Sequence, residues 1–71
     1  MSDRENMVEA IQRECERVRG IIKIYDELEG GVGVFRASWM RELIKRSEKA
    51  IANLDVVECV ACLKELREVE A

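Results

Sequence analysis

The stretch Gly30-Gly31-Val32-Gly33-Val34-Phe35-Arg36 decides the fold, because it is the one clear break between two long helical patterns. Glycine readily adopts the left-handed backbone conformations that end helices. A break of this kind between two amphipathic helices predicts an antiparallel helical hairpin. Glycine-rich backbone at the start of a helix is also the kind of backbone that binds anions, so both interpretations are open for this stretch.

Before the break, the spacing predicts a helix over residues 3–29. Ser2 and Glu5 have the spacing of a capping box, and Gly30 is placed to stop the helix. Apolar residues recur on this helix in steps of three and four, and Ile21, Ile24 and Leu28 widen the apolar arc beyond what one neighbouring helix covers. The first turns also overhang the shorter helices that follow. We therefore expect a symmetric homo-oligomer. The predicted interface residues are Ile11, Cys15, Val18 and Ile22.

After the break, the pattern predicts a helix over residues 34–53 and a third over residues 55–69. The short turn Asn53-Leu54-Asp55 separates them, and Asp55 with Glu58 forms a second capping-box pattern. The apolar stripe of the second helix is Met40, Leu43, Ser47, Ala50 and Leu54. That of the third is Val56, Cys59, Val60, Leu63 and Leu66. The sequence thus predicts one all-α domain, residues 1–71, of three helices without a strand.

Charge is distributed unevenly along the chain, although the net charge of the 71 residues is only −3. Residues 31–54 carry five bases and two acids, whereas residues 1–30 carry eight acids and five bases and residues 55–71 five acids and two bases. This pattern favours charge pairing between helices. The alternative is a basic helix that faces an anionic partner. The acidic flanking helices disfavour duplex nucleic acid as that partner. The bases of the middle helix are Arg36, Arg41, Lys45, Arg46 and Lys49.

Composition indicates a cytoplasmic protein. No apolar run approaches the roughly 18–20 residues that a membrane span needs. Residues 1–6 lack the basic and then apolar layout of a signal peptide. Three cysteines, an odd number, argue against a secreted disulfide framework and for a reducing compartment.

The side chains available for catalysis are few. The chain has no histidine, the usual general base and the commonest metal ligand. Cys59-Val60-Ala61-Cys62 has the spacing of a zinc or redox motif. A structural zinc site normally needs four ligands, and Cys15 is the one further cysteine in the chain. Buried core thiols are therefore favoured over metal or redox use. Glu14 falls in the apolar arc of the first helix, where a register-fixing salt bridge with Arg17 is favoured over an acid–base role. We predict a protein that is not an enzyme and that has no metal and no cofactor.

The aromatic residues Tyr25, Phe35 and Trp39 gather around the glycine loop. One interpretation is that they close the end of the core. The other is a ligand site in which open glycine N–H groups, the helix dipole and Arg36 bind an anion while an aromatic ring stacks on a base. In an oligomer, a neighbouring first helix would supply a lysine. The candidate ligand-binding residues are Lys23, Tyr25, Gly31, Gly33, Phe35, Arg36 and Trp39.

Ile21-Ile22-Lys23-Ile24-Tyr25-Asp26-Glu27-Leu28, the glycine loop and Phe35-Arg36-Ala37-Ser38-Trp39 together form a layout that resembles small phage- and prophage-encoded helical proteins. More narrowly, it resembles the helical-hairpin nucleotide sponges that phages use against host signalling defences. The resemblance implies an oligomer that sequesters a cyclic nucleotide without hydrolysing it. The third helix with its CxxC departs from that pattern.

Two functions are therefore expected as alternatives. The first is an anti-defence accessory protein that sequesters an anionic small molecule such as a nucleotide signal at the loop end of the hairpin. The second is an inhibitor or adaptor that blocks a host protein through an exposed helix face.

Overall fold

The computed structural model describes residues 3–31 and 33–70 and consists of helices, with no strand in these residues. The elements are α1 (Asp3–Asp26), the short 3-10 turn η1 (Glu29–Gly31), α2 (Val34–Ala52) and α3 (Val56–Glu68). The predicted all-α architecture of three packed helices is confirmed. The predicted capping box at Ser2 and Glu5 rests on Ser2, which lies outside the described residues.

The first helix ends three residues earlier than predicted, because the chain tightens before it reaches the glycines. The N–H of Glu27 donates to the carbonyl oxygens of Lys23 and Ile24, and the N–H of Leu28 donates to Tyr25 O, each at 3.2 Å. Bonds that span three residues tighten the last turn of a helix in this way.

The glycines of the loop have different structural roles. Gly30 and Gly31 have φ angles of 71° and 69°, in the left-handed region that favours glycine. Gly33 instead allows close packing, because a Cβ at this position would lie 2.7 Å from Tyr25 Cδ1 and 2.8 Å from Tyr25 O. The break therefore forms the predicted hairpin by letting the chain reverse and by letting α2 begin directly against the end of α1.

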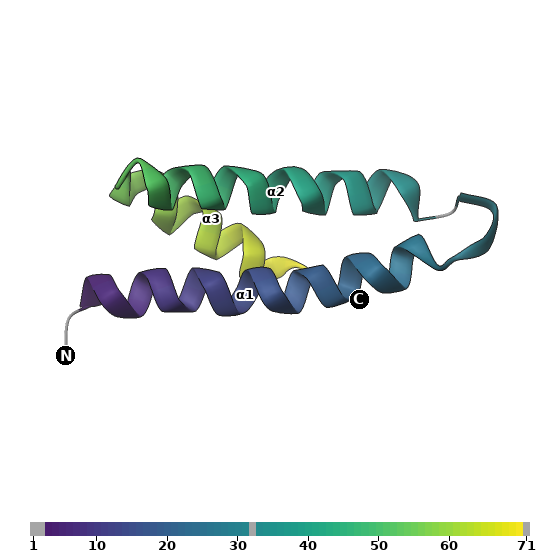
Figure 1. The fold of residues 1–71 in the computed structure, drawn as a ribbon, viewed down its shortest axis with the longest axis horizontal. Helices are drawn as coiled ribbons and strands as arrows, with labels where there is room; N and C mark the ends of the chain where they lie inside the picture. The colour runs from purple at the N-terminus through teal and green to yellow at the C-terminus, as the bar shows by residue number, and fades with distance from the viewer. Residues whose placement is uncertain (1–2, 32, 71) are drawn as a thin grey trace.

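The three helices form an elongated bundle with extents of 45 × 20 × 16 Å (Figure 1). α1 and α2 run antiparallel, and α3 folds back across them, ending about half-way along α1. Arg17 fixes this position, since its guanidinium donates to Leu66 O at 2.8 Å and to Val69 O at 2.9 Å. As a result, α3 covers only the half of the hairpin that lies away from the glycine loop.

The core lies between the three helices and corrects the predicted interface. Ile11 and Val18 are fully buried, and Cys15 and Ile22 are 3% and 7% exposed, within a single chain. The predicted helix lengths would leave the first turns of α1 without a neighbouring helix in the same chain. In the structure, Met7 packs against the core, and a hollow of about 230 Å³ separates Met7 and Val8 from Leu54 and Val56 of the α2–α3 turn. Ile11, Cys15, Val18 and Ile22 are therefore core residues, and they are not available to a second copy. Self-association itself stays a prediction.

The α2–α3 turn is a Schellman motif with an unusual residue at its centre. Asp55 N–H donates to Ala50 O at 3.0 Å and Leu54 N–H donates to Ile51 O at 3.1 Å, which satisfies the last carbonyls of α2. Leu54 has the left-handed φ of 54° and is 84% exposed, so its assignment to the apolar stripe of α2 was wrong. The residue lies beyond the last turn of α2, and its side chain no longer follows the helical period.

The cap of α3 matches the prediction only in part. Asp55 Oδ1 accepts from Glu58 N–H at 3.1 Å, as predicted. The carboxylate of Glu58 does not complete a reciprocal capping box, because it pairs with Arg46 at 2.7 Å and the N–H of Asp55 is bonded to Ala50.

The buried face of α3 is rotated from the predicted one. Cys59 and Leu66 are buried as expected, but Val56 and Val60 are 53% and 54% exposed and Cys62 is fully buried. With this rotation, Glu58 and Glu65 lie on the edge of α3 that faces α2, where Arg46 pairs with both. The buried line on the third segment is Cys59, Cys62, Leu66 and Val69.

Ion pairs between helices agree with the charge-pairing interpretation. Basic α2 meets acidic α3 through Arg46 and acidic α1 through the pair of Arg41 with Asp26. Arg19 of α1 pairs with Glu48 of α2 at 2.9 Å, in the opposite sense. Within α1, Arg17 pairs with Glu14 at 2.8 Å, as predicted.

Candidate functional site

The loop half of the hairpin has one side that α3 does not reach. Arg17 on α1 and Arg46 on α2 mark the edges that face α3, because both bond to it. Ile24 lies two turns after Arg17 and Trp39 two turns before Arg46, so both lie on these same edges. In the described residues, the third-helix position thus holds a helix over one half of the hairpin only, and the chain after α3 reaches the other half through Glu70, whose carbonyl accepts from Arg36.

Large apolar side chains gather on the half of the hairpin that α3 does not reach. Ile24 is 54% exposed, Leu28 43%, Trp39 45% and Phe35 89%. Phe35 and Trp39 are one turn apart on α2 and so project from the same edge. We call these four residues the loop-end surface. An exposed phenylalanine next to an exposed tryptophan is uncommon on a protein surface and indicates a contact surface.

Arg36 adds a cation to the loop-end surface. Its guanidinium carbon lies 5.9 Å from the centroid of the Trp39 ring, within the range of a cation–π contact. Its Nη2 also donates to the backbone carbonyl of Glu70 at 3.5 Å, the long end of a hydrogen bond. The guanidinium is exposed and only weakly held, so a stronger acceptor could take the place of that carbonyl.

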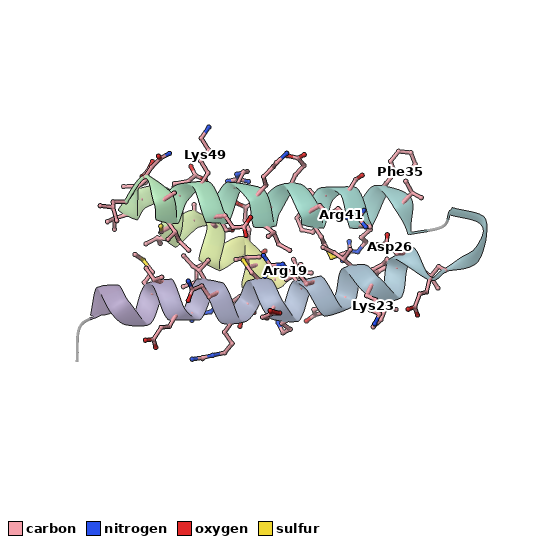
Figure 2. The ribbon with its side chains drawn as sticks, in the orientation of Figure 1. Arg19, Lys23, Asp26, Phe35, Arg41 and Lys49 are labelled. Atoms are coloured by element: carbon pink, nitrogen blue, oxygen red, sulfur yellow. The ribbon has the colours of Figure 1, made fainter. Side chains whose placement is uncertain are left out.

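The structure brings only some of the predicted ligand-binding residues together. Arg36 contacts Trp39, and Tyr25 packs against Gly33. Lys23 extends from the side of α1 that faces away from α2, whereas Phe35 extends from the opposite outer side of α2 (Figure 2). Lys23 therefore does not join Phe35 within one chain. The ring of Tyr25 is half-buried against the core rather than open for stacking.

The start of α2 keeps the electrostatic features of an anion site. Gly33 is the N-cap and makes no side-chain capping bond, and the first turn carries no acidic residue. The first helical bond runs from Ala37 N–H to Gly33 O at 2.8 Å, so the N–H groups of the preceding residues lie at the positive end of the helix dipole. Gly31 is exposed in the turn before it. The space beside the Gly33 Cα, however, is filled by Tyr25.

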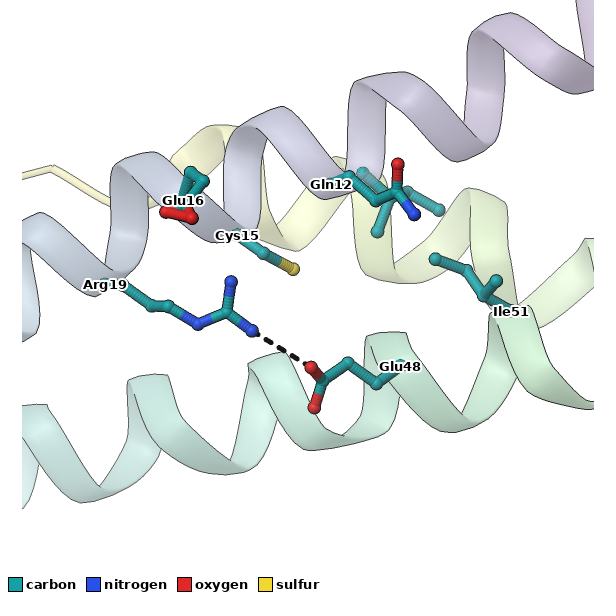
Figure 3. Close-up of a pocket in the computed structure, with 7 residues that line it drawn as sticks. Gln12, Cys15, Glu16, Arg19, Glu48 and Ile51 are labelled. Carbon is teal, nitrogen blue, oxygen red and sulfur yellow. Dashed lines mark hydrogen bonds and ion pairs between the residues drawn. The ribbon is translucent and has the colours of Figure 1, made fainter.

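A groove between α1 and α2 lies on the side away from α3 and was not anticipated from the sequence. It has a volume of about 350 Å³, and the pair Arg19–Glu48 spans it at 2.9 Å (Figure 3). Cys15, a residue 3% exposed, lies in it, and burial raises the pKa of its thiol. The signal in the sequence that could have predicted this groove is that oppositely charged residues flank the apolar stripes of the two helices. The thiol is protonated near neutral pH and the two charges neutralise each other, so the groove offers no activated nucleophile.

The cysteines lie where the core interpretation places them. Cys15, Cys59 and Cys62 are all buried, and burial raises the pKa of each thiol. Cys62 Sγ donates to Glu58 Oε1 at 3.5 Å. Among the described residues, no group of three or more histidine, cysteine, aspartate or glutamate side chains is arranged to hold a metal ion.

Comparisons with protein-family models, with curated proteins and with solved structures find no match to this chain. In residues 3–31 and 33–70, no helix is both long and apolar enough to cross a bilayer. The resemblance to phage nucleotide sponges therefore stays a prediction from the sequence.

Proposed function

We propose that this protein is a non-enzymatic interaction module that binds and blocks or bridges another protein through its loop-end surface. The observation that carries the proposal is the exposure of Phe35, 89%, beside Trp39, 45%, on the edge of a third-helix position that α3 leaves uncovered. Both side chains project from a regular helix, so a partner does not have to order their backbone on association.

The composition of the loop-end surface fits a binding hot spot. Aromatic residues and arginine dominate the energetics of protein interfaces, and each such anchor can contribute about 2 kcal/mol or more when a partner buries it. Phe35 and Trp39 supply the aromatic anchors and Arg36 the cation. Ile24 supplies apolar area on the α1 side of the same position, and Leu28, in the bend after α1, adds exposed apolar area near the loop.

The chemistry of the surface also indicates the kind of partner. A bundle with an uncovered third-helix position accommodates an amphipathic helix, which lays its apolar face against the two helices present. Arg36 favours an acidic residue on that helix, because a carboxylate accepts a stronger hydrogen bond than the Glu70 carbonyl at 3.5 Å. The proposed partner is therefore a protein that presents an acidic amphipathic helix.

Sequestration of an anionic small molecule, such as a nucleotide signal in an anti-defence role, is the second candidate. The uncapped start of α2, with no acid in its first turn and with Arg36 over the Trp39 ring, supports it. The distance between Lys23 and Phe35 across the hairpin counts against a complete pocket within one chain (Figure 2).

One experiment separates the two candidates. A photo-crosslinking amino acid is placed at position 35 of the protein in cells of the source organism. The matched control carries it at position 45, because Lys45 is also exposed on α2. The interaction proposal expects one discrete adduct from position 35 and none from position 45. Excess unlabelled protein should suppress the adduct, and Trp39→Ala protein should not compete.

A nucleotide titration followed by Trp39 fluorescence forms the other arm. Binding that is weakened by about 1.5–3 kcal/mol in Arg36→Ala, and not in Lys45→Ala, would establish the small-molecule function. Absence of an adduct together with such binding would overturn the interaction proposal.

A further inference from the structure

The residues that follow α3 lie at the edge of the loop-end surface. Val69 leaves the helix in an extended conformation, with φ −73° and ψ 127°, and its side chain is 1% exposed in the core. Glu70 comes next and is exposed. In Figure 1 this yellow end of the chain continues from α3 toward the loop end of the hairpin. We call residues 69–70 the C-terminal strap, because a buried residue anchors it and an exposed residue carries it onto the other half of the hairpin.

Two arginines, one from each helix of the hairpin, hold the strap with unequal strength. Arg17 of α1 donates to Val69 O at 2.9 Å, in a part-buried hydrogen bond. Arg36 of α2 donates to Glu70 O at 3.5 Å, in an exposed bond at the limit of hydrogen-bond length. Water competes for both groups of an exposed bond, so its net contribution is small. The strap is therefore fixed at Val69 and held only loosely at Glu70.

The loosely held contact is made by the cation of the loop-end surface. The guanidinium carbon of Arg36 lies 5.9 Å from the centroid of the Trp39 ring while Nη2 donates to Glu70 O. The strap also follows α3 into the third-helix position, where the proposed partner helix would lie. A helix that docks against Ile24 and Trp39 would thus meet the strap and the arginine that the strap engages.

We infer that the C-terminal strap is a built-in competitor for the loop-end surface, in which Glu70 O occupies Arg36 until a carboxylate of the partner displaces it. This inference rests on the interaction function proposed above. The exchange is favourable, because a carboxylate is a stronger acceptor for a guanidinium than a neutral carbonyl. Val69 stays in the core as the pivot, so Glu70 moves while α3 keeps its place.

The strap acts on both the affinity and the choice of partner. Apparent affinity falls in proportion to the fraction of molecules in which Arg36 is free. A helix without an acidic residue opposite Arg36 displaces the strap and gains no stronger hydrogen bond in return. The strap therefore favours acidic helices over neutral ones of the same shape.

The reactivity of Arg36 toward phenylglyoxal, an arginine reagent, tests the strap without any partner. Chemical synthesis gives a protein that ends at Val69 in an amide, which keeps the anchor and adds no charge beside Arg36. Arg36 should react about twofold faster or more in this shortened protein, because only molecules with a free guanidinium react. Arg13, exposed on α1, is the internal reference, and far-UV circular dichroism confirms that the helices are kept.

Glu70→Ala is the matched control for this measurement, since it removes the exposed carboxylate and keeps the carbonyl that Arg36 contacts. Arg36 in this variant should react at the wild-type rate. An unchanged rate in the shortened protein, or an equal increase in Glu70→Ala, would overturn the inference.

Backbone dynamics of the full chain give an independent measurement that needs no shortened protein. Arg36→Ala should lower the heteronuclear NOE of the Glu70 amide and leave that of Val69, which Arg17 holds, unchanged. Lys45→Ala, also on the exposed side of α2, is the control and should change neither. A Glu70 amide that is as ordered in Arg36→Ala as in the wild type would contradict the contact on which the inference depends.

Photo-crosslinking from position 35 separates this inference from the proposed function. Both lengths of the protein are synthesised with the crosslinking residue and added to a lysate of the source organism at equal concentration. The shortened protein should give more of the adduct, and equal yields would overturn the inference while the proposed function stands. Faster Arg36 modification without an adduct from either protein would overturn the proposed function and keep Glu70 as the competitor for Arg36.

Discussion

Arg17 of α1 donates to the carbonyl oxygen of Leu66 at 2.8 Å, in the last turn of α3. A second N–H of the same guanidinium donates to Val69 O at 2.9 Å, and Glu14 accepts from Nε at 2.8 Å. The last carbonyls of a helix have no partner within it, and a cation at this end is also favoured by the helix dipole. One arginine thus caps α3 and fixes how far it extends along α1.

We therefore expect Arg17→Ala to lower the free energy of unfolding by about 2 kcal/mol, since two hydrogen bonds from a charged group are lost. The carbonyl of Val69 loses this donor, whereas that of Leu66 keeps the N–H of Val69 at 3.2 Å. Urea titration followed by far-UV circular dichroism measures the change. Arg13→Ala, an exposed arginine one turn earlier, is the control and should stay within about 0.5 kcal/mol of the wild type. Equal effects of the two substitutions would show that the Arg17 bonds do not hold α3.

Two glycine-to-alanine substitutions should have opposite effects. Gly33→Ala places a Cβ 2.7 Å from Tyr25 Cδ1 and 2.8 Å from Tyr25 O, and backbone cannot give way as a side chain can. We expect a loss of about 1–3 kcal/mol of stability. Gly20→Ala has no neighbour within 4 Å and lies inside α1, so it should raise stability by up to about 1 kcal/mol through helix propensity. The unfolding temperatures of both variants test these two expectations. A Gly33→Ala variant that is more stable than the wild type would contradict the close packing of Gly33 against Tyr25.

Leu54→Gly should stabilise the α2–α3 turn. The φ of 54° is unfavourable for an L-residue by about 1–2 kcal/mol, and glycine removes that cost at the C′ position of a Schellman motif. Leu54→Ala keeps the strained backbone while it removes the exposed side chain, and should change the midpoint of denaturation little. A gain of the same size in both variants would mean that the side chain, and not the backbone, is responsible.

The buried thiols should make stability depend on pH in the alkaline range. Burial raises the pKa of Cys62, whose thiol is fully buried, so the folded state holds its proton more tightly than the unfolded state does. Its contribution is complete below the unfolded thiol pKa of about 8.5 and is lost as the pH rises from there through the raised folded pKa.

Cys62→Ala should cost on the order of 1 kcal/mol at neutral pH from lost packing. The stability difference between wild type and Cys62→Ala should then shrink at alkaline pH, as denaturation midpoints along a pH series would show. A difference that stays constant across this range would contradict the assignment of a protonated core thiol.

Local signals in the sequence were enough to determine the helices and the hairpin. Gly30 and Gly31 have the positive φ that only glycine adopts without strain, and Asp55 caps α3 through its own side chain. The apolar period of α1 likewise identified Ile11, Cys15, Val18 and Ile22 as one face. Each of these features depends on interactions within a few residues of the chain, which is why the sequence alone determined them.

The rotation and reach of α3 were decided by tertiary structure. Val60 and Cys62 are both apolar and two residues apart, so periodicity cannot say which of them is buried. In the folded chain, Cys62 is buried in line with Cys59, Leu66 and Val69, and Glu58 and Glu65 then meet Arg46 at the edge of α2. The exposure of Trp39 depends in the same way on where Arg17 holds the end of α3. Contacts between residues distant in the chain therefore decide which apolar residues form the core and which remain available to a partner.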